Sequence, residues 1–541
     1  MDLEESSNQD AHKLAVSKLG HRLDEIYQGG GKKRIVKHHN KGKLTARERI
    51  DYLLDPDSDR FEIGAFAALG MYEEYGGAPS AGVVVVQGYI RGRMVIVVAN
   101  DATVKAGAWF PMTGKKNLRA QEIAMENRIP IIYLVDSAGV FLPLQDKIFP
   151  DKEHFGRIFR NNARLSSMGV HQIAAVMGSC VAGGAYLPIM SDESLIVEGS
   201  GSIFLAGPYL VKAAIGENVD AETLGGAVTQ SEISGIIDHK MPNERSCLDR
   251  IKDLVEKIKP NTKLGFIRDQ AKEPKIDIDE MYGHFPKERT KPYPILPILE
   301  AIVDADSITQ YKKGYGKTIT CAYANINGWG VGIVANNRAL VRSKSGETQF
   351  GGVIYSDAAD KAARFIMLCN QRQLPLIFIH DVTGFMVGTR SEQGGIIKDG
   401  AKMVNAVANS TVPKISVIIG NSYGAGNYAM CGKAYDPRLI VAWPSARIAV
   451  MGGSQAAEVL TQIQLSSLKK KGEEPDEKLQ KELYEKISES YGAQTSPYYA
   501  AARLWVDAII DPKDTRKLIS MGIEAANEGV IEPFVPGVFQ V

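Results

Sequence analysis

Short apolar runs alternate along this chain with longer stretches in which apolar and polar residues follow a helical period. The runs "IPIIYLVD" (129–136) and "IAAVMGS" (173–179) predict buried strands, because Gly and Pro bound them. The stretches "GKKNLRAQEIAMENR" (114–128) and "SDAADKAARFIMLCNQRQ" (356–373) predict amphipathic helices. Strands and helices in alternation favour an α/β fold with a mostly parallel sheet and right-handed crossovers.

The same pattern occurs twice in the chain. The segment "IPIIYLVDSAGVFLP" (129–143) matches "LPLIFIHDVTGFMVG" (374–388), so that one Pro, one Asp and one Gly each recur 245 residues later. The Gly-rich segments "GSCVAGGAYLP" (178–188) and "GNSYGAGNYAM" (420–430) repeat at a spacing of 242 residues. A nearly constant spacing over separate motifs indicates an internal duplication, and we predict two tandem α/β domains.

Three segments fall outside the repeat. The second half has extra residues around "GETQFGGVIYSD" (346–357) and at "QLSSLKKKGEEPDEKLQKELYEKISES" (464–490). The latter is charged and rich in helix formers, which predicts a pair of surface helices. The polar, Pro-containing segment 269–294 is predicted to be the linker between the domains.

The two Gly-rich segments are candidates for chemistry. A buried strand that runs through a small-residue turn into a helix leaves backbone N–H groups without intrahelical partners, and the helix dipole adds positive potential there. Gly183-Gly184 and Ala425-Gly426 would let a phosphate, a carboxylate or an oxyanion approach those amides. The alternative is close packing of helix on sheet. Two copies at matched positions favour two oxyanion sites, one for each of two enolate-like anions.

Composition adds mainly exclusions. The chain has 541 residues and a net charge of +1, which gives no electrostatic attraction to nucleic acid or to a membrane surface. No apolar run approaches the roughly 20 residues of a membrane span. Five scattered cysteines without a C-x-x-C pair favour a reducing compartment. We therefore predict a cytoplasmic protein, or a mitochondrial matrix protein whose presequence has been removed.

Other motifs fail on single residues. "KKGYGKT" (312–318) is similar to a P-loop, but Tyr311 stands where that motif requires glycine. "GAKMV" (400–404) is similar to a biotin-accepting segment, but Ala401 replaces the methionine that precedes such a lysine. The nine histidines show no metal-ligand spacing, so no metal site is predicted.

The long motifs resemble the carboxyltransferase (β) subunits of biotin-dependent acyl-CoA carboxylases. The resemblance rests on the two Gly-rich segments and on "GKLTARERIDYLLD" (42–55), "HFGRIFRNNARLSSMGV" (154–170) and "AIIDPKDTRKLI" (508–519). It runs from about residue 17 to the C-terminus. "TGFMVG" and "SYGAGNY" are typical of the methylcrotonyl-CoA carboxylase branch, whereas "GGVIYSD" is closer to the propionyl-CoA branch.

The resemblance implies two crotonase-like ββα superhelix domains, an N-terminal domain at 17–270 and a C-terminal domain at 273–532. It implies that the amides of Gly183 and Gly184 stabilise a thioester enolate, and that those of Ala425 and Gly426 stabilise the ureido oxygen of biotin. The remaining implied contacts are Tyr423, Gly424 and Phe385 on the biotin side, Lys115, Lys116 and Arg119 for the CoA phosphates, and Ser307 and Asn336 as the ends of an acyl-CoA region.

The implied activity is transfer of a carboxyl group from carboxybiotin to an acyl-CoA, most closely 3-methylcrotonyl-CoA. Propionyl-, acetyl-, geranyl- or longer acyl-CoA, and the reverse reaction in a biotin-dependent decarboxylase, are the alternatives. The biotin would be carried by an α subunit with biotin carboxylase and carrier domains, and only that subunit would use ATP and Mg. The family typically forms a β6 core, here of an α6β6 complex, with each site between the N-domain of one subunit and the C-domain of another.

Overall fold

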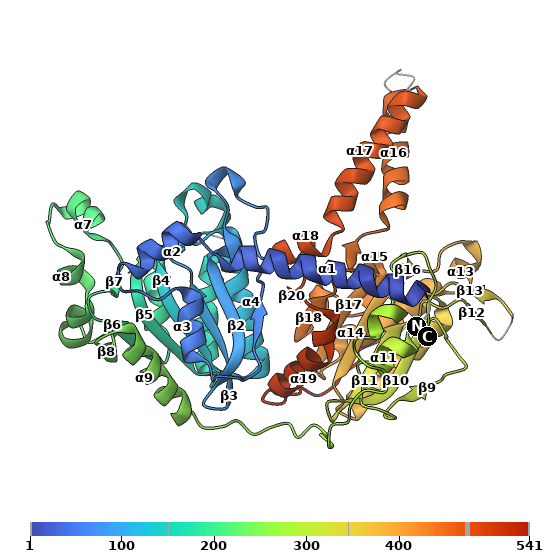
Figure 1. Ribbon diagram of the computed structural model, residues 1–541, viewed down its shortest axis with the longest axis horizontal. Coiled ribbons are helices and arrows are strands. Elements are labelled where there is room, and N and C mark those ends of the chain that lie inside the picture. Colours follow the sequence, from blue (N-terminus) through green and yellow to red (C-terminus); the bar gives the residue numbers. More distant parts are fainter. Residues whose placement is uncertain (1–2, 150, 344–345, 471–475, 539–541) are drawn as a thin grey trace.

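A computed structural model describes residues 3–149, 151–343, 346–470 and 476–538. The chain forms two α/β halves side by side, each built on one sheet with helices around it (Figure 1). The first sheet has the order β1-β2-β3-β4-β5-β6-β8, and β7 pairs with β5. Its strands are β1 (Phe61–Ile63), β2 (Val83–Ile90), β3 (Arg93–Asn100), β4 (Ile131–Ser137), β5 (Gln172–Val181), β6 (Glu193–Val197), β7 (Ser202–Phe204) and β8 (His239–Met241).

The second sheet has the order β20-β18-β17-β15-β11-β10-β9, and β19 pairs with β17. Its strands are β9 (Thr309–Tyr311), β10 (Ile319–Ile326), β11 (Trp329–Asn336), β15 (Leu376–Val382), β17 (Lys414–Tyr423), β18 (Leu439–Ala442), β19 (Arg447–Ala449) and β20 (Ala508–Ile509). Two small ribbons pair β12 (Val341–Arg342) with β13 (Thr348–Gln349), and β14 (Val353–Ile354) with β16 (Gly384–Phe385).

The two sheets match strand for strand. In each, two antiparallel pairings are followed by parallel ones, from β1-β2-β3 onward and from β9-β10-β11 onward. The parallel register shifts at the same place in both, between Val135 and Ser137 and between His380 and Val382. This confirms the predicted α/β duplication, since chance would not repeat both the order and the irregularity.

Helices cover both sheets. Those of the first half are α1 (Leu3–Tyr27), α2 (Lys32–His39), α3 (Ala46–Leu53), α4 (Pro111–Asn127), α5 (Phe155–Ser167), α6 (Tyr186–Ile189), α7 (Pro208–Ile215), α8 (Ala221–Gly225) and α9 (Glu244–Lys257). Those of the second are α10 (Met281–His284), α11 (Leu296–Glu300), α12 (Ser356–Gln371), α13 (Thr389–Gln393), α14 (Ile396–Asn409), α15 (Gly424–Ala429), α16 (Gly453–Lys470), α17 (Glu477–Gln494), α18 (Pro497–Ala502) and α19 (Thr515–Ala526).

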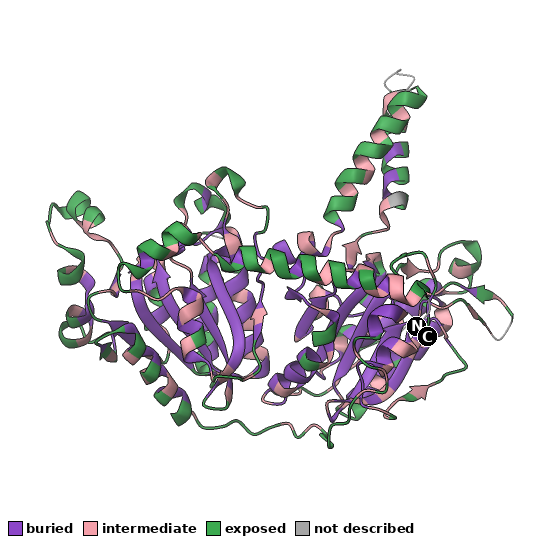
Figure 2. Cartoon of the chain, viewed as in Figure 1, coloured by how far each residue is buried: buried purple, intermediate pink, exposed green. Residues whose placement is uncertain are grey.

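The halves are joined by packing as well as by the chain. Figure 2 shows buried residues concentrated in the strands of both sheets. One apolar cluster contains residues of both halves, among them Ile131 and Ile377. Arg119 of α4 forms an ion pair with the buried Asp507 of the second half, with 2.8 Å between Nη2 and Oδ2. The two sheets therefore have a fixed relative position within one chain.

The segment predicted as a linker is only partly a linker. Residues 269–280 follow an irregular path, but Met281, Phe285 and Tyr293 are buried against the second half. Helix α1 crosses from the first half to this region (Figure 1). There the Asn8 amide donates a hydrogen bond to the carbonyl oxygen of Gly283 at 3.0 Å. The polar composition of 269–294 thus conceals residues that belong to the core.

The predicted pair of surface helices is α16 and α17. The two helices lie side by side and project away from the second sheet (Figure 1). The first half has the short helices α7 and α8 at the corresponding place, after β7. The extra residues of the second half therefore extend an element that is present in both copies.

Candidate active site

The two Gly-rich turns have the same backbone path. Strand β5 runs through a single 3₁₀ turn, Ala182–Ala185, into α6, and β17 runs directly into α15. The residue that follows each strand adopts a left-handed conformation, with φ of 57° at Ala182 and 52° at Gly424. This conformation costs a non-glycine residue about 1 kcal/mol or more, so Ala182 carries strain at the turn.

The turns differ in the space beside them. A Cβ added at Gly184 would meet no atom within 4 Å, and one at Gly183 would lie 3.2 Å from the ring of Phe155. Ala425 is exposed, whereas Gly426 is buried and a Cβ there would lie 2.6 Å from Cγ2 of Val382. The small size of Gly426 is therefore required by packing, while Gly184 faces open space that a ligand can enter.

A buried carboxylate lies beneath each turn. Asp136 and Asp381 stand at the ends of β4 and β15, and both are at most 4% exposed. A Cβ on Gly178 or Gly420, near the end of the next strand, would collide with these carboxylates at 1.9 Å and 2.4 Å. The glycines that open both motifs are thus needed to admit a charged side chain under the turn.

Different groups stabilise the two carboxylates. Asp136 forms ion pairs with Lys43 and with the fully buried Arg49, and Arg49 also pairs with Glu244. Burial acts to raise the pKa of Asp136, but these two cations hold it below its usual value.

Asp381 instead accepts a hydrogen bond from the Tyr293 hydroxyl at 2.7 Å, and Nε of Arg338 lies 3.5 Å away. Burial and the Asp381 charge raise the pKa of Tyr293. Each site therefore has a buried carboxylate of its own, and the charged groups around the two carboxylates differ.

Comparison with known proteins identifies the family to which this chain belongs. The carboxyl transferase domain family matches residues 37–536. The chain belongs to this family. It is 46% identical over 534 residues to the biotin-dependent 3-methylcrotonyl-coenzyme A carboxylase beta1 subunit of Mycobacterium tuberculosis, covering 98% of both chains. It is also 46% identical to the probable mitochondrial methylcrotonoyl-CoA carboxylase beta chain of Drosophila melanogaster, covering 97% of this chain and 91% of that one.

The fold is similar to that of a solved structure of a carboxylase beta subunit. The beta subunit of geranyl-CoA carboxylase from P. aeruginosa superposes with a TM-score of 0.86 at 33% identity, and the match covers 100% of this chain and 98% of that one. The fold is therefore that of the carboxyltransferase β subunits of biotin-dependent acyl-CoA carboxylases, a crotonase-like fold in two repeated halves, as predicted.

The residues predicted on the biotin side lie around the second turn. Tyr423 ends β17 and is half-buried, and burial raises the pKa of its hydroxyl. Gly424 lies against Val450, whose carbonyl oxygen would be 2.8 Å from an added Cβ. Phe385 packs its ring on Gly400 of α14. Phe385 thus helps to hold α14 in place, and Tyr423 and Gly424 form the turn itself.

Ser307 and Asn336 hold backbone groups in the second half. The Ser307 hydroxyl donates to the carbonyl oxygen of Asp304 at 2.7 Å. The Asn336 side-chain oxygen accepts from the backbone N–H of Asp381 at 3.1 Å, and Asn100 does the same for Asp136 in the first half. Asn336 therefore supports the second buried carboxylate, and its role toward an acyl-CoA stays a prediction.

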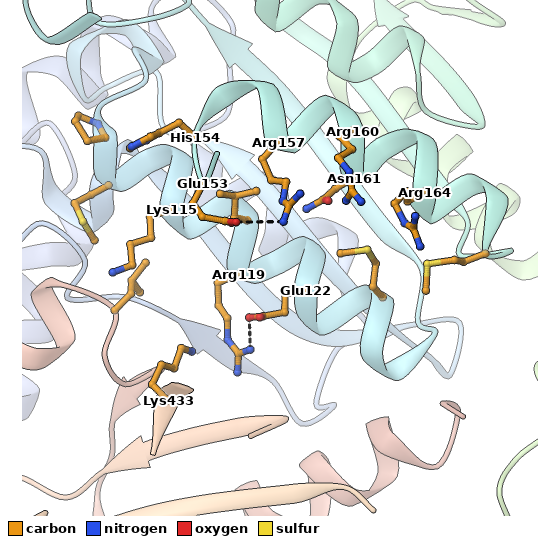
Figure 3. A pocket seen from close by; sticks show the side chains of 16 residues that line it. Lys115, Arg119, Glu122, Glu153, His154, Arg157, Arg160, Asn161, Arg164 and Lys433 are labelled. Carbon is orange, nitrogen blue, oxygen red and sulfur yellow. Dashed lines mark hydrogen bonds and ion pairs between the residues drawn. The ribbon is translucent and has the colours of Figure 1, made fainter. Parts of the chain in front are cut away.

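Two of the three residues predicted to bind the CoA phosphates point inward. The Lys116 ammonium is fully buried and donates hydrogen bonds to the carbonyl oxygens of Ser80 and Val83 and to the Ser80 hydroxyl. Arg119 is 5% exposed and forms ion pairs with Asp507 and Glu122, the second of which Figure 3 shows. The Lys115 ammonium donates to the carbonyl oxygen of Arg503 at 2.8 Å. The assignment of these three residues to the CoA phosphates stays a prediction.

The sequence contains a signal for the buried position of Lys116. Lys361 lies 245 residues after Lys116, and its ammonium donates to three backbone carbonyl oxygens at the matching place in the second half. A lysine that occurs in both copies serves the common scaffold rather than one ligand. Aligning the two halves position by position would have separated Lys116 from Lys115, whose counterpart is Asp360.

Other predictions can be placed more briefly. Lys402, the lysine of the rejected biotin-acceptor segment, pairs with Asp360 and Asp399, each at 3.0 Å. Within the described ranges, no three His, Cys, Asp or Glu side chains are grouped as a metal site. Across the same residues, no helix combines the length and apolarity that crossing a membrane requires.

Proposed function

We propose that this chain transfers the carboxyl group of carboxybiotin, held by a partner subunit, to an acyl-CoA ester. Family membership and the two relatives support the reaction class. The observation that carries the proposal is the repeated strand-to-helix turn, which has open space at Gly184 and an exposed Ala425. Two such turns in one chain suit a reaction with two oxyanions, because preorganised amides stabilise developing negative charge.

Each turn has its own role in this proposal. The amides of Gly183 and Gly184 bind the thioester oxygen and stabilise the charge that develops when the acyl group loses its acidic proton. The amides of Ala425 and Gly426 bind the ureido oxygen of biotin, with Tyr423, Gly424 and Phe385 around it. Carboxybiotin supplies the carboxyl group. The second turn fits an exposed ligand on a carrier, since Ala425 is open to solvent.

We propose 3-methylcrotonyl-CoA as the substrate. The relatives from M. tuberculosis and D. melanogaster are named for this acyl group, and the P. aeruginosa neighbour is named for geranyl-CoA. Both acyl groups contain a 3-methyl-2-enoyl thioester and differ in the length of the chain beyond it. Geranyl-CoA is therefore the second candidate.

We further propose that the site is completed by a second copy of the chain. The two turns belong to different halves. Apolar side chains are exposed on the segments that follow β7 and β19, the strands that pair with β5 and β17: Leu205 (59%), Tyr209 (94%), Val450 (73%) and Ile463 (59%). Exposed apolar surface of this kind marks protein interfaces. A β6 core of an α6β6 complex, with ATP and Mg used only by the α subunit, is the assembly we expect. The expected compartment is the cytoplasm or, behind a presequence, the mitochondrial matrix.

A reconstitution experiment tests the proposal. The purified chain is combined with a subunit that carries biotin carboxylase and biotin carrier domains, and bicarbonate fixation is measured with 3-methylcrotonyl-, geranyl-, propionyl- and acetyl-CoA. We expect the highest kcat/KM with 3-methylcrotonyl-CoA and no fixation by the isolated chain. Equal or better use of propionyl-CoA would refute the substrate, and fixation without the partner would refute the division of labour.

A further inference from the structure

Three polar side chains beside the second turn are joined by hydrogen bonds. Ser422 of β17 lies at the centre and is fully buried. Its hydroxyl oxygen accepts a hydrogen bond from the side-chain amide of Asn427, on α15, at 2.8 Å. The same hydroxyl lies 3.0 Å from Nδ1 of His380, which is on β15 and is also fully buried. This network of His380, Ser422 and Asn427 therefore joins two neighbouring strands to the turn.

Burial fixes the protonation state of the network. It lowers the pKa of His380 to about 3, so the imidazole is neutral near pH 7. A neutral imidazole has one bare nitrogen, which can accept a hydrogen bond. Because Asn427 is the donor toward Ser422, the Ser422 hydroxyl is free to donate its own hydrogen to Nδ1 of His380. A buried network in which donors and acceptors are defined in this way favours one arrangement of the groups that it joins.

The first half shows that the common fold does not require this network. The residues at the matching positions are Val135 for His380, Cys180 for Ser422 and Ala185 for Asn427. The register of the sheets supports the match, since the first pair stands just before the shift in parallel register and the second just after it. All three first-half residues are at most 5% exposed, and valine and alanine side chains form no hydrogen bonds. The same backbone path is thus packed with apolar or weakly polar side chains in one half and held by hydrogen bonds in the other.

Other contacts restrict the same segment of the second turn. Gly426 packs on Val382, whose Cγ2 would lie 2.6 Å from an added Cβ. The backbone N–H of Gly432 donates to the carbonyl oxygen of Asn427 at 2.8 Å. A Cβ added at Gly432 would lie 1.9 Å from Oδ1 of Asn427. The Asn427 side chain is therefore enclosed between Ser422 and the backbone at Gly432, and it is held there by the hydrogen bond to Ser422.

We propose that the three side chains of this network are positioning residues, which hold the amides of Ala425 and Gly426 toward the ureido oxygen of biotin. This inference rests on the proposed function, because it assigns residues that support one of the two oxyanion turns. Preorganised donors stabilise developing charge while they stay aimed at the oxygen, and a displacement of about 1 Å can lower a rate about 100-fold. Asn427 directly follows Gly426 in the chain, so loss of its anchor moves those amides. The three side chains act through the backbone and not by contact with a substrate.

Replacing Ser422 with alanine tests the inference in the full chain, reconstituted with its biotin-carrying partner. We expect kcat for carboxylation of 3-methylcrotonyl-CoA to fall about tenfold or more, because the turn loses its anchor. The KM for the acyl-CoA should stay unchanged, since the proposed acyl-CoA site is at the other turn. The matched control is Ser410→Ala, which removes a buried hydroxyl that accepts from the Asn370 amide at 2.9 Å, before the start of β17. This control should lose stability but keep its kcat.

His380 separates hydrogen bonding from packing. His380→Asn keeps a hydrogen-bonding atom two bonds from Cβ, as Nδ1 is, whereas His380→Val copies the first half. Both variants lose the volume of the ring, so a role in packing alone predicts similar kcat values. We expect His380→Asn to retain at least threefold more kcat than His380→Val. Asn427→Ala copies Ala185 at a half-buried position, and it keeps the test available if substitutions at the two fully buried positions prevent folding.

Amide hydrogen exchange reports on the turn without any carboxyl transfer. We expect faster exchange across residues 423–430 in Ser422→Ala and in Asn427→Ala, and unchanged exchange there in Ser410→Ala. Unchanged exchange together with a kcat within threefold of the wild type, in both network variants at unchanged assembly mass, would overturn the inference. Failure of the proposed function looks different: the wild type would fix no bicarbonate with any acyl-CoA, while the variants would still differ in exchange as expected.

Discussion

Replacing Gly184 with alanine should remove activity without destabilising the protein. An added Cβ at Gly184 meets nothing within 4 Å, and its φ lies outside the left-handed region. A substitution of this kind stabilises a protein by about 0.4–1 kcal/mol, because alanine has less freedom in the unfolded chain. The methyl group would, however, occupy the space from which a thioester oxygen approaches the amides. Loss of one oxyanion donor costs about 2.7–4 kcal/mol, or about 10²–10³ in kcat.

Gly426→Ala is the matched comparison at the second turn. Its Cβ would lie 2.6 Å from Cγ2 of Val382 inside the core. Overpacking of this kind costs about 1–3 kcal/mol in stability, and Val382→Ala in the same chain should recover part of it. Urea unfolding and the reconstituted carboxylation assay are run on each variant, with assembly mass as the control. Full turnover by Gly184→Ala, or equal destabilisation by both substitutions, would show that the two glycines do not differ as argued.

Two further predictions follow from the buried charges. Lys116→Met and Lys361→Met should each lower the free energy of unfolding by about 1–3 kcal/mol, because buried carbonyl groups lose a hydrogen-bond donor. Neither variant should change the KM for acyl-CoA. A tenfold rise in KM for Lys116→Met would instead support a contact between Lys116 and the CoA phosphates. Asp136→Asn should lower the free energy of unfolding by about 3–5 kcal/mol at neutral pH, because Arg49 and Lys43 lose their shared carboxylate partner. In the folded protein the pKa of Asp136 is depressed below 3.8. The Asp136 carboxylate therefore stabilises the folded state above that pH, and this contribution is lost as the pH falls further. Identical acid unfolding profiles for the wild type and Asp136→Asn would contradict this.

The duplication and both turns could be predicted from the sequence, because they are properties of local pattern. Apolar β-branched runs predicted β4 and β5, and the spacing of the Gly-rich motifs predicted that the strands repeat. The contacts of single residues could not be predicted in this way. Gly184 and Gly426 look alike in sequence, but only Gly426 faces Val382, a residue 44 positions earlier that the fold brings beneath it.

In two segments the sequence pattern misses a buried side chain, for the same physical reason. The family resemblance implies a phosphate contact for Lys116, but in the structure α4 turns that side chain under β2, where it reaches Ser80 and Val83. The polarity of segment 269–294 predicts a linker, but Tyr293 in this segment reaches the buried Asp381. In both cases composition described the segment correctly and gave no information on which single side chain is buried.

The internal repeat supplies that information, since the two halves act as controls for each other. Positions that keep their residue in both, such as Asp136 with Asp381 and Gly178 with Gly420, hold the turn in place. Positions at which the two halves have different residues indicate properties that belong to one half only. The α14 lysine that pairs with Asp360 has no counterpart pair in the first half, where Lys115 stands instead. The ion pair that joins α12 and α14 is therefore a feature of the second half, and α4 and α5 pack against each other without it.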